Sequence, residues 1–151
     1  MAAPVDSVAI AKEAMLARNK ATALAFCQGM GTKPADELIK DFAPDITDYG
    51  DGSMKPVKGA DSAGYYFKMY LAAFPDVKGE NLVALADGNQ VAVFGDWSGT
   101  WKKDMMGMKA TGKTFKIKDV DLFTFNDAGK ITEHKSVQSN QTMISQLMKK
   151  K

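Results

Sequence analysis

The order of elements along the chain predicts an α+β fold, with helices packed on one curved antiparallel sheet. Two segments of the first half have helical composition, an alanine-rich one over 8–28 and an aromatic-rich one over 62–74. Strand-like runs separated by turn residues occupy most of 82–139. Helices followed by a meander of strands are typical of α+β domains. We expect residues 1–151 to form a single domain, because neither a linker nor a repeat interrupts this order.

The first two helices are defined by their end signals. Asp6 or Ser7 can cap the alanine-rich helix, and Gly29 ends it. A second, shorter helix is expected to start after Pro34, where two acidic residues favour a helix N-terminus. Pro44 is expected to end that helix, because proline cannot continue the helical hydrogen-bond pattern.

Proline and glycine also delimit the middle of the chain. The turn-rich segment 46–56 predicts one short strand or hairpin. The aromatic-rich helix is expected to start at Asp61 and to end before Pro75, since proline disfavours helical geometry in the residue before it. Its large side chains are expected to supply much of the core, namely Tyr65, Tyr66, Phe67, Tyr70, Leu71 and Phe74.

Period-two patterns in the second half predict the strands. A hairpin is expected over 82–101, with an Asp87-Gly88 turn between its strands. Two further strands are expected over 114–125 and 130–139, followed by a terminal helix over 141–148.

Alternation along the strand 114–125 identifies its inner face. The odd positions hold four apolar residues and two aspartates, whereas lysines occupy even positions. This register places Asp121 near Phe123 and Phe125, where loss of solvent favours the neutral carboxyl and makes the group usable as an acid or base. Replacing it with asparagine is then expected to stabilise the fold near neutral pH. The alternative is a bulge near Asp119 that turns a carboxylate to water, or a purely hydrogen-bonding role.

The last strand offers a second set of polar candidates on its even positions, which include His134 and Ser136. His134 is the only histidine of the chain and could act as a general base. A hydrogen-bonded structural role is the alternative for a single histidine in a strand. Asp48 could add a further carboxylate from another wall.

Five short motifs carry a resemblance to one known family. They are, in chain order, Ala73-Phe74-Pro75-Asp76, Ala86-Asp87-Gly88, Trp97-Ser98-Gly99-Thr100-Trp101, Ala110-Thr111-Gly112-Lys113 and Gly129-Lys130-Ile131-Thr132-Glu133-His134. In this order the chain resembles the SnoaL-like polyketide cyclases, a branch of the nuclear transport factor 2-like superfamily. The resemblance covers most of the chain. It implies a conical α+β fold in which N-terminal helices and the curved sheet enclose a pocket.

The resemblance also implies a chemistry. A polyketide-cyclase-like protein would transfer a proton next to a carbonyl of a small hydrophobic molecule without a cofactor, with Asp121 as base and Asp48 or His134 assisting. Some members of the family carry an acid/base aspartate two residues after the histidine that corresponds to His134, and here that position is Ser136. A hydroxyl cannot replace that carboxylate without an activating partner. The alternative is a non-catalytic small-ligand-binding or protein-interaction module of the same fold.

The pocket is expected to be lined by aromatic, thioether and hydroxyl side chains, namely Tyr49, Tyr66, Tyr70, Trp97, Met105, Met106, Met108, Phe123 and Ser136. The methionines of the loop 102–109 adapt to irregular apolar shapes, so this loop could form a lid over a hydrophobic ligand or, equally, a dimer contact. Trp97 and Trp101 share a strand face. They are expected to pack either on this loop or across a subunit interface, and with the open face of the sheet they favour a homodimer.

Composition limits the other classes of function. The net charge of +2 predicts no nucleic-acid partner, and no apolar run approaches the ~20 residues that span a bilayer, so no membrane partner is expected. Cys27 is the only cysteine, which excludes an internal disulfide and a cysteine-based zinc site, and it is expected to be a core residue. One histidine and scattered aspartates predict no metal site, and no cofactor is expected.

The ends of the chain give two weaker expectations. We expect a bacterial cytoplasmic protein, although Ala2-Ala3-Pro4 leaves an exported mature form as the alternative. Lys149-Lys150-Lys151 is expected to be a solvated tail.

Overall fold

The computed structural model describes residues 6–148, and it forms helices on a six-stranded sheet. Ala2-Ala3-Pro4 and the lysine tail, both considered above, lie outside the described residues. In chain order the elements are α1 (Ser7–Gly29), α2 (Ala35–Leu38), the 3₁₀ turn η1 (Ile39–Asp41), β1 (Phe42–Asp48), β2 (Val57–Lys58), α3 (Ala60–Ala73), β3 (Lys78–Asp87), β4 (Gln90–Thr100), β5 (Thr114–Phe125), β6 (Ile131–Ser136) and α4 (Asn140–Leu147).

The sheet has the strand order β2-β1-β6-β5-β4-β3. Its neighbouring strands are antiparallel except for β1 and β6, which run parallel. The expected α+β class is therefore confirmed, but the sheet is mixed. The parallel pair arises because β1 and β6 lie far apart in sequence and are joined by most of the domain, whereas a tight hairpin can only join antiparallel strands.

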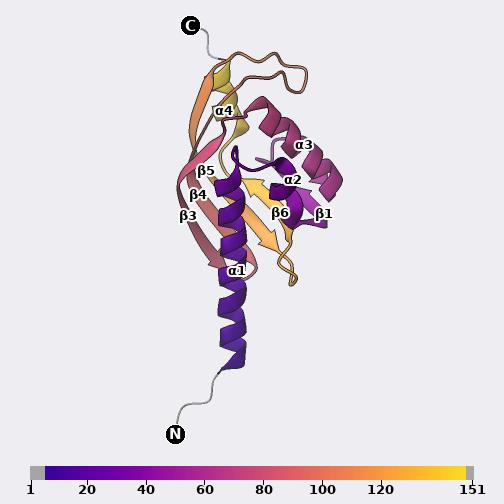
Figure 1. The fold of residues 1–151 in the computed structure, drawn as a ribbon, viewed down its shortest axis with the longest axis vertical. Helices are drawn as coiled ribbons and strands as arrows, with labels where there is room; N and C mark the ends of the chain where they lie inside the picture. The colour runs from indigo at the N-terminus through magenta and orange to yellow at the C-terminus, as the bar shows by residue number, and fades with distance from the viewer. Residues whose placement is uncertain (1–5, 149–151) are drawn as a thin grey trace.

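The helices cover one side of the sheet. α1 packs against β3 and β4, α3 packs against β1 and β2, and α4 packs against β5. Figure 1 shows the sheet curving beside α1, whose first turns project past the end of the sheet. Residues 7–14 of this helix are accordingly exposed. Within residues 6–148, no helix combines the length and apolar character needed to cross a membrane.

The start of α1 follows the sequence signal. The Asp6 carboxylate accepts hydrogen bonds from the backbone N–H groups of Val8 at 3.1 Å and Ala9 at 3.2 Å, so Asp6 is the N-cap. After α1, Gly31 has a φ of +77°, and a Cβ there would lie 2.0 Å from the carbonyl oxygen of Val77. Only glycine allows this close approach of two backbone segments.

The expectation that the second helix runs to Pro44 was wrong. Helical structure ends at Asp41, and Phe42 and Pro44 belong to β1. Proline fits this strand because β2 pairs with β1 only at Thr47 and Asp48, so the missing N–H of Pro44 interrupts no β1–β2 hydrogen bond. The short apolar run around Phe42 was compatible with either a helix or a strand.

The expected hairpin over 82–101 was located correctly, with a difference in its turn. Asp87 pairs with Gln90, so the first two-residue turn is Gly88-Asn89 and not Asp87-Gly88. β4 and β5 pair without interruption from Gln90–Thr124 to Thr100–Thr114. This continuous register confirms that the odd positions of β5 face inward, and it excludes a β4–β5 bulge near Asp119.

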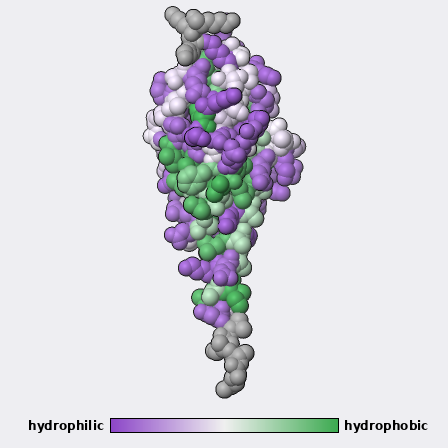
Figure 2. All heavy atoms as spheres, turned by 90° about the vertical axis from the view of Figure 1, so that its left-hand side faces the viewer, coloured by the Kyte–Doolittle hydropathy of each residue, from purple (hydrophilic) through white to green (hydrophobic). Residues whose placement is uncertain are grey.

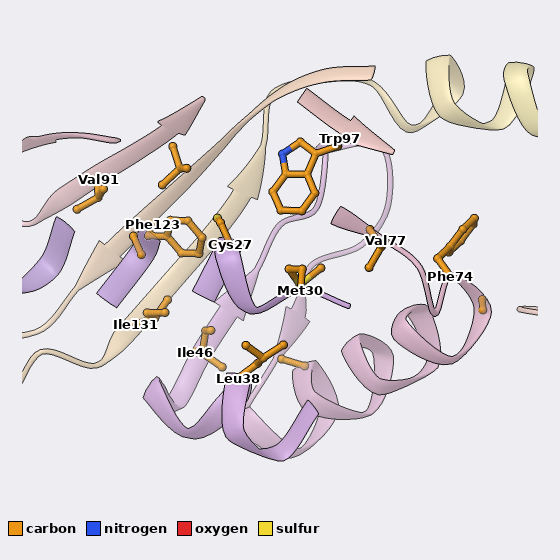
Figure 3. Close-up of a cluster of buried hydrophobic side chains, with 14 of the residues drawn as sticks. Cys27, Met30, Leu38, Ile46, Phe74, Val77, Val91, Trp97, Phe123 and Ile131 are labelled. Atoms are coloured by element: carbon orange, nitrogen blue, oxygen red, sulfur yellow. The ribbon is translucent and has the colours of Figure 1, made fainter. Parts of the chain in front are cut away.

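Both tryptophans lie in the core. Of the two packings expected for them, against the methionine loop or across a subunit interface, Trp101 shows the first. Trp97 is 8% exposed and Trp101 is 2% exposed, because their strand face is the one that the helices cover. Figure 3 shows Trp97 above Met30 of α1, with Cys27 beside Phe123. Cys27 is 1% exposed, which confirms it as a core residue. The Trp101 indole donates to the carbonyl of Lys103 at 2.8 Å, so this side chain fixes the base of the methionine loop.

The aromatic helix α3 is less fully buried than its composition suggested. Tyr65 is 65% exposed and Tyr66 is 45% exposed, whereas Phe74 is fully buried. Helical periodicity explains the difference, because consecutive residues cannot all face the sheet.

The methionine loop contains a turn with two residues of positive φ. A substitution in this turn tests its conformation. Met105 and Met108 exchange two backbone hydrogen bonds, of 3.0 and 2.9 Å, around Met106 and Gly107, which have φ values of +50° and +77°. Asparagine tolerates this left-handed conformation better than methionine, and Met106 is 52% exposed. Replacing Met106 with asparagine is expected to raise the free energy of unfolding by about 0.5–1 kcal/mol in urea titrations. Met108→Asn is the control and should give no gain. A loss of stability in Met106→Asn would contradict the turn geometry.

Candidate functional site

A cavity of about 340 Å³ lies between the helices and the sheet. This volume falls within the range of small-molecule sites. Its apolar walls come from α1, β1, β2, α3, β4, β5 and α4, through the side chains of Phe26, Cys27, Met30, Phe42, Val57, Ala63, Tyr66, Phe67, Tyr70, Trp97, Phe115, Ile117 and Met143.

A row of polar side chains forms the remaining wall on three neighbouring strands. β1 contributes Asp48, β6 contributes His134 and Ser136, and β5 contributes Asp119 and Asp121. The register explains this row, because Asp48 pairs with His134 and Asp121 pairs with Ser136. Residues paired across adjacent strands point to the same face. The sheet therefore gathers residues from both halves of the chain on one side of the cavity.

His134 lies between two carboxylates. Its Nδ1 is 3.0 Å from Asp48 Oδ1 and its Nε2 is 2.9 Å from Asp121 Oδ1. Two carboxylate acceptors require both ring nitrogens to donate, which is the hydrogen-bonding pattern of the imidazolium cation. Burial by itself lowers the pKa of His134, but the hydrogen bonds and charges of Asp121 and Asp48 outweigh burial and raise the pKa to about 10. At neutral pH the ring is a cation and cannot serve as a general base.

Asp48 is the more solvated of the two partners. Its side chain is 34% exposed, against 16% for Asp121. Burial opposes its charge, but the hydrogen bond and charge of His134, with a 2.9 Å hydrogen bond from the Gly50 N–H, lower the pKa of Asp48 below its usual value. Asp48 is thus an ionised partner of the imidazolium at neutral pH.

Asp119 has a different environment from Asp121. Its Oδ1 accepts from the backbone N–H groups of Val120 at 2.7 Å and Gln138 at 2.8 Å, and its Oδ2 accepts from the hydroxyl of Ser136. Three donors fix this carboxylate in place and hold the end of β6 against β5. By contrast, Asp121 Oδ2 accepts no hydrogen bond from the described residues 6–148, so it is free to accept a proton from a ligand.

The negative charge of the polar wall acts on two neighbouring groups. Burial, followed by the charges of Asp121 and Asp119, raises the pKa of the Cys27 thiol and of the Tyr70 phenol. Cys27 is therefore an unreactive thiol at neutral pH. Tyr70 keeps its proton and can donate a hydrogen bond into the cavity.

The structure brings together most of the residues that the sequence singled out. The cavity is lined by Asp48, Asp121, His134, Tyr66, Tyr70, Trp97 and Ser136. Tyr49 and Phe123 do not line it. Tyr49 follows Asp48 in the chain and is 38% exposed, and the Phe123 ring packs against the His134 ring with centroids 5.1 Å apart.

The methionines Met105, Met106 and Met108 do not line the cavity, contrary to expectation. Their loop extends beyond the ends of β4 and β5, where Met105 packs against the core and the other two side chains are exposed. A lid formed by this loop is therefore not part of the structure. The reason is that Trp101 exchanges backbone hydrogen bonds with Lys113 and Gly112, which prolongs the hairpin away from the cavity.

Two features of the site were missed at the sequence level. A hydrogen-bonding role for Asp121 was one of the alternatives, but the sequence did not identify His134 as its partner. Replacement of Asp121 by asparagine would leave the imidazolium with one carboxylate, so the expected stabilisation no longer follows. Asp119 was on the correct face, but its role in fixing Ser136 and Gln138 depends on contacts across strands that periodicity does not reveal.

Metal-binding potential is limited in the described part of the chain. Within residues 6–148, histidine, cysteine, aspartate and glutamate side chains form no group of three suited to holding a metal ion. The two carboxylates beside His134 are already engaged with its ring.

Comparison with known proteins agrees with this architecture. The helices, the curved sheet and the enclosed cavity define a protein of the nuclear transport factor 2-like or ketosteroid-isomerase-like fold. The chain belongs to the SnoaL-like polyketide cyclase family, whose model matches residues 21–147. No curated protein matches the sequence.

Several solved structures share the fold. A SnoaL-like protein from Jannaschia sp. CCS1 is 18% identical, with 91% of this chain and 96% of that chain covered and a TM-score of 0.79. AclR from Streptomyces galilaeus, proposed to be a hydroxylase, is 26% identical with coverage of 90% and 99% and a TM-score of 0.73. A ketosteroid-isomerase-like protein from Catenulispora acidiphila, in complex with trimethylamine, is 16% identical with coverage of 83% and 91% and a TM-score of 0.67.

Proposed function

We propose that this protein is a polyketide-cyclase-like enzyme that transfers a proton next to a carbonyl of a small, largely apolar molecule, without a cofactor. One observation carries the proposal. An imidazolium lies between two carboxylates, at 3.0 and 2.9 Å, on the polar wall of a cavity whose other walls are largely apolar. Such a row holds a proton acceptor and a cationic donor side by side, which is the arrangement that general acid–base chemistry requires.

Each residue has a distinct role in this mechanism. Asp121, with one oxygen bound to His134 and the other free of described donors, removes a proton from the carbon next to the carbonyl. Negative charge then develops on the carbonyl oxygen, and the Tyr70 hydroxyl is placed in the same cavity to donate to it. His134 and Asp48 hold Asp121 in position, and the imidazolium offsets the negative charge of the two carboxylates.

Ser136 does not supply the missing carboxylate of the family pattern. Its hydroxyl donates to Asp119 Oδ2, so it organises β5 and β6. A serine nucleophile would need a neighbouring base that is free to accept its proton, and Asp119 already accepts two backbone hydrogen bonds. A serine at position 136 favours the second candidate function, a non-catalytic small-ligand-binding module. In such a module His134 and Asp121 only orient the ligand.

Hydrogen exchange distinguishes the enzyme from the binding module. The purified protein is incubated in D₂O with a panel of aromatic and aliphatic methyl ketones and β-ketoesters, and the loss of α-hydrogen signal is followed by NMR. An enzyme accelerates exchange of at least one compound over the buffer rate. Saturable binding of these compounds without accelerated exchange would instead support the binding module. Native mass spectrometry of the freshly purified protein provides a direct search for a retained ligand.

We also propose that the outer face of the sheet forms a homodimer. Val83, Phe94 and Val120 are cross-strand neighbours on this face, and Val137 donates a backbone hydrogen bond to Val120. The exposed fractions of Val83, Phe94 and Val137 are 55%, 44% and 63%. Figure 2 shows apolar residues gathered in the middle of the molecule on the side that is at the left in Figure 1, with polar residues around them. A contiguous apolar patch with a polar rim is typical of a protein interface.

Replacing Phe94 with lysine is expected to dissociate this dimer. A lysine at the centre of the apolar patch would have to be buried without a partner, which should weaken association by about 100-fold or more. Light scattering should therefore give twice the 16.3 kDa chain mass for the parent protein and the chain mass for the variant. The control is Val8→Lys, which makes the same kind of change at an exposed apolar residue of α1 outside the patch, where Val8 is 77% exposed. A parent protein that is monomeric at micromolar concentration would contradict the proposal.

A further inference from the structure

The charges that line the cavity are strongly biased toward one sign. Four carboxylates line it, those of Asp48, Asp51, Asp119 and Asp121, and His134 is the one basic side chain among the lining residues. Within residues 6–148, no lysine or arginine lines it. The net charge of +2 for the whole chain does not indicate this local excess of negative charge. An anionic ligand would thus meet repulsion from the cavity wall that one imidazolium cannot offset.

Aromatic side chains make up much of the remaining lining. Rings from α1, β1, α3, β4 and β5 surround the same space, namely those of Phe26, Phe42, Tyr66, Phe67, Tyr70, Trp97 and Phe115. The faces of such rings attract cations, and the attraction increases when the cation is removed from water. Aromatic rings and carboxylates, which line this cavity together, are the two kinds of group that hold an organic ammonium ion.

The carboxylates of the polar wall act on two titratable groups of the helices, Cys27 and Tyr70. Burial raises the pKa of Cys27 on α1 and of Tyr70 on α3, and the charges of Asp121 and Asp119 raise both further. A negative charge on either group is therefore disfavoured by the wall. By the same electrostatic argument, a positive charge placed in this space is favoured.

We propose that the cavity selects a small organic cation, a molecule whose apolar body carries an ammonium group. This inference rests on the proposed small-molecule site and specifies the charge of its ligand. The carboxylates do not create the site, which is the cavity itself, but they determine which ligands enter it. An ammonium group on the substrate also assists the proposed chemistry, because it offsets the negative charge that develops on the carbonyl oxygen after Asp121 takes the proton.

A set of three molecules of nearly equal shape tests the selection by charge. Choline is a cation, 3,3-dimethylbutan-1-ol is its neutral carbon counterpart, and 3,3-dimethylbutanoate is an anion of similar size. Binding is measured by calorimetry, and displacement of the neutral dye Nile red reports whether each molecule enters the apolar cavity. We expect choline to bind at least tenfold more tightly than the alcohol, and the anion to bind most weakly. Equal affinities, or tightest binding of the anion, would overturn the proposal.

Asp51 lies outside the proposed catalytic residues, so replacing it tests the selection by charge separately from the chemistry. Asp51 lines the cavity, and its Oδ2 accepts a 2.7 Å hydrogen bond from the Asn140 N–H. Its Oδ1 accepts from the N–H and the hydroxyl of Ser53, so an asparagine side chain keeps the accepted hydrogen bonds of one oxygen only. Asp51→Asn is expected to weaken choline binding about threefold or more and to leave the alcohol unchanged. The matched control is Asp45→Asn, an exposed position of β1 that does not line the cavity, which should bind all three molecules like the parent protein. Equal loss for choline and the alcohol in Asp51→Asn would contradict selection by charge.

The outcomes separate this inference from the proposed function. If the cation and its neutral counterpart both displace Nile red with equal affinity, the small-molecule cavity stands and the charge selection is wrong. If neither the dye nor any of the three molecules binds, both the cavity as a ligand site and the cation selection are wrong.

Discussion

Replacing His134 with glutamine is expected to lower the free energy of unfolding by about 3–5 kcal/mol at pH 7. The imidazolium is 20% exposed and is the only described group that bridges Asp48 and Asp121. A glutamine amide can still donate hydrogen bonds but carries no charge, so the two carboxylates would lose the cation that they share. Urea titration of both proteins measures the difference.

The pH dependence of the free energy of unfolding is an independent test of the contacts between His134 and the two carboxylates. The pKa of His134 is raised from about 6.5 in the unfolded chain to about 10 in the folded protein, so the folded state binds this proton more tightly. Its stabilisation is complete below pH ~6.5 and is lost as the pH rises toward 10, with a slope of up to about 1.4 kcal/mol per pH unit. Asp48 acts in the opposite direction, because its pKa is lowered and its contribution is lost as the pH falls below about 4.

His134→Gln should therefore remove the decline in stability between pH 6.5 and 10. Lys135→Gln, on the opposite face of the same strand, is the control and should keep that decline. The double variant Asp48→Asn with His134→Gln should recover part of the lost stability at pH 7, because one unpaired carboxylate is removed. A His134→Gln protein that loses less than about 1 kcal/mol, or that keeps the parent pH dependence, would show that the ring is not a shared cation.

Replacing Asp121 with asparagine is expected to reduce the rate of α-hydrogen exchange by a factor of about 10²–10⁴. Asparagine is close to aspartate in shape and can accept the hydrogen bond from His134, but it cannot take a proton from carbon. In the parent protein the rate should fall as the pH rises through about 10, because the imidazolium that orients Asp121 is then lost. The measurement is the NMR exchange assay with the ketone that the parent protein processes fastest.

Asp45→Asn is the control for this variant, because it makes the same change at an exposed position outside the cavity. It should exchange at the parent rate. Binding of the same ketone should be retained in Asp121→Asn, which separates loss of chemistry from loss of the site. An Asp121→Asn protein that keeps more than a tenth of the parent rate would remove Asp121 as the base.

The strands of the second half could be predicted from the sequence, because alternation of side chains along a strand is a local pattern. β5 pairs with β4 without a break, so simple alternation from Phe115 onward identified the inner face on which Asp121 lies. The even positions of β6 gave His134 and Ser136 in the same way. Asp121 and His134 come from adjacent antiparallel strands and are 13 residues apart, so a single hairpin brings them together.

Asp48, which forms a cluster with His134 and Asp121, could not be placed beside them by strand alternation. Asp48 reaches His134 through the parallel pairing of β1 with β6, across 86 residues of sequence. The start of β1 was itself assigned to a helix, because the short apolar run around Phe42 fits either structure and Pro44 was read as a stop signal. Parallel pairing depends on the packing of the whole domain and leaves no turn motif in the sequence.

The sequence by itself therefore determined the α+β class, the family, the strand faces and the identity of most polar site residues. Only the tertiary structure decided the charge of His134, because that charge depends on two carboxylates that reach the ring from different strands. It also decided that the tryptophans are buried and that the methionine loop lies away from the cavity. Periodicity reports which face a side chain occupies, whereas its partner and its protonation state follow from distances that only the packed chain sets.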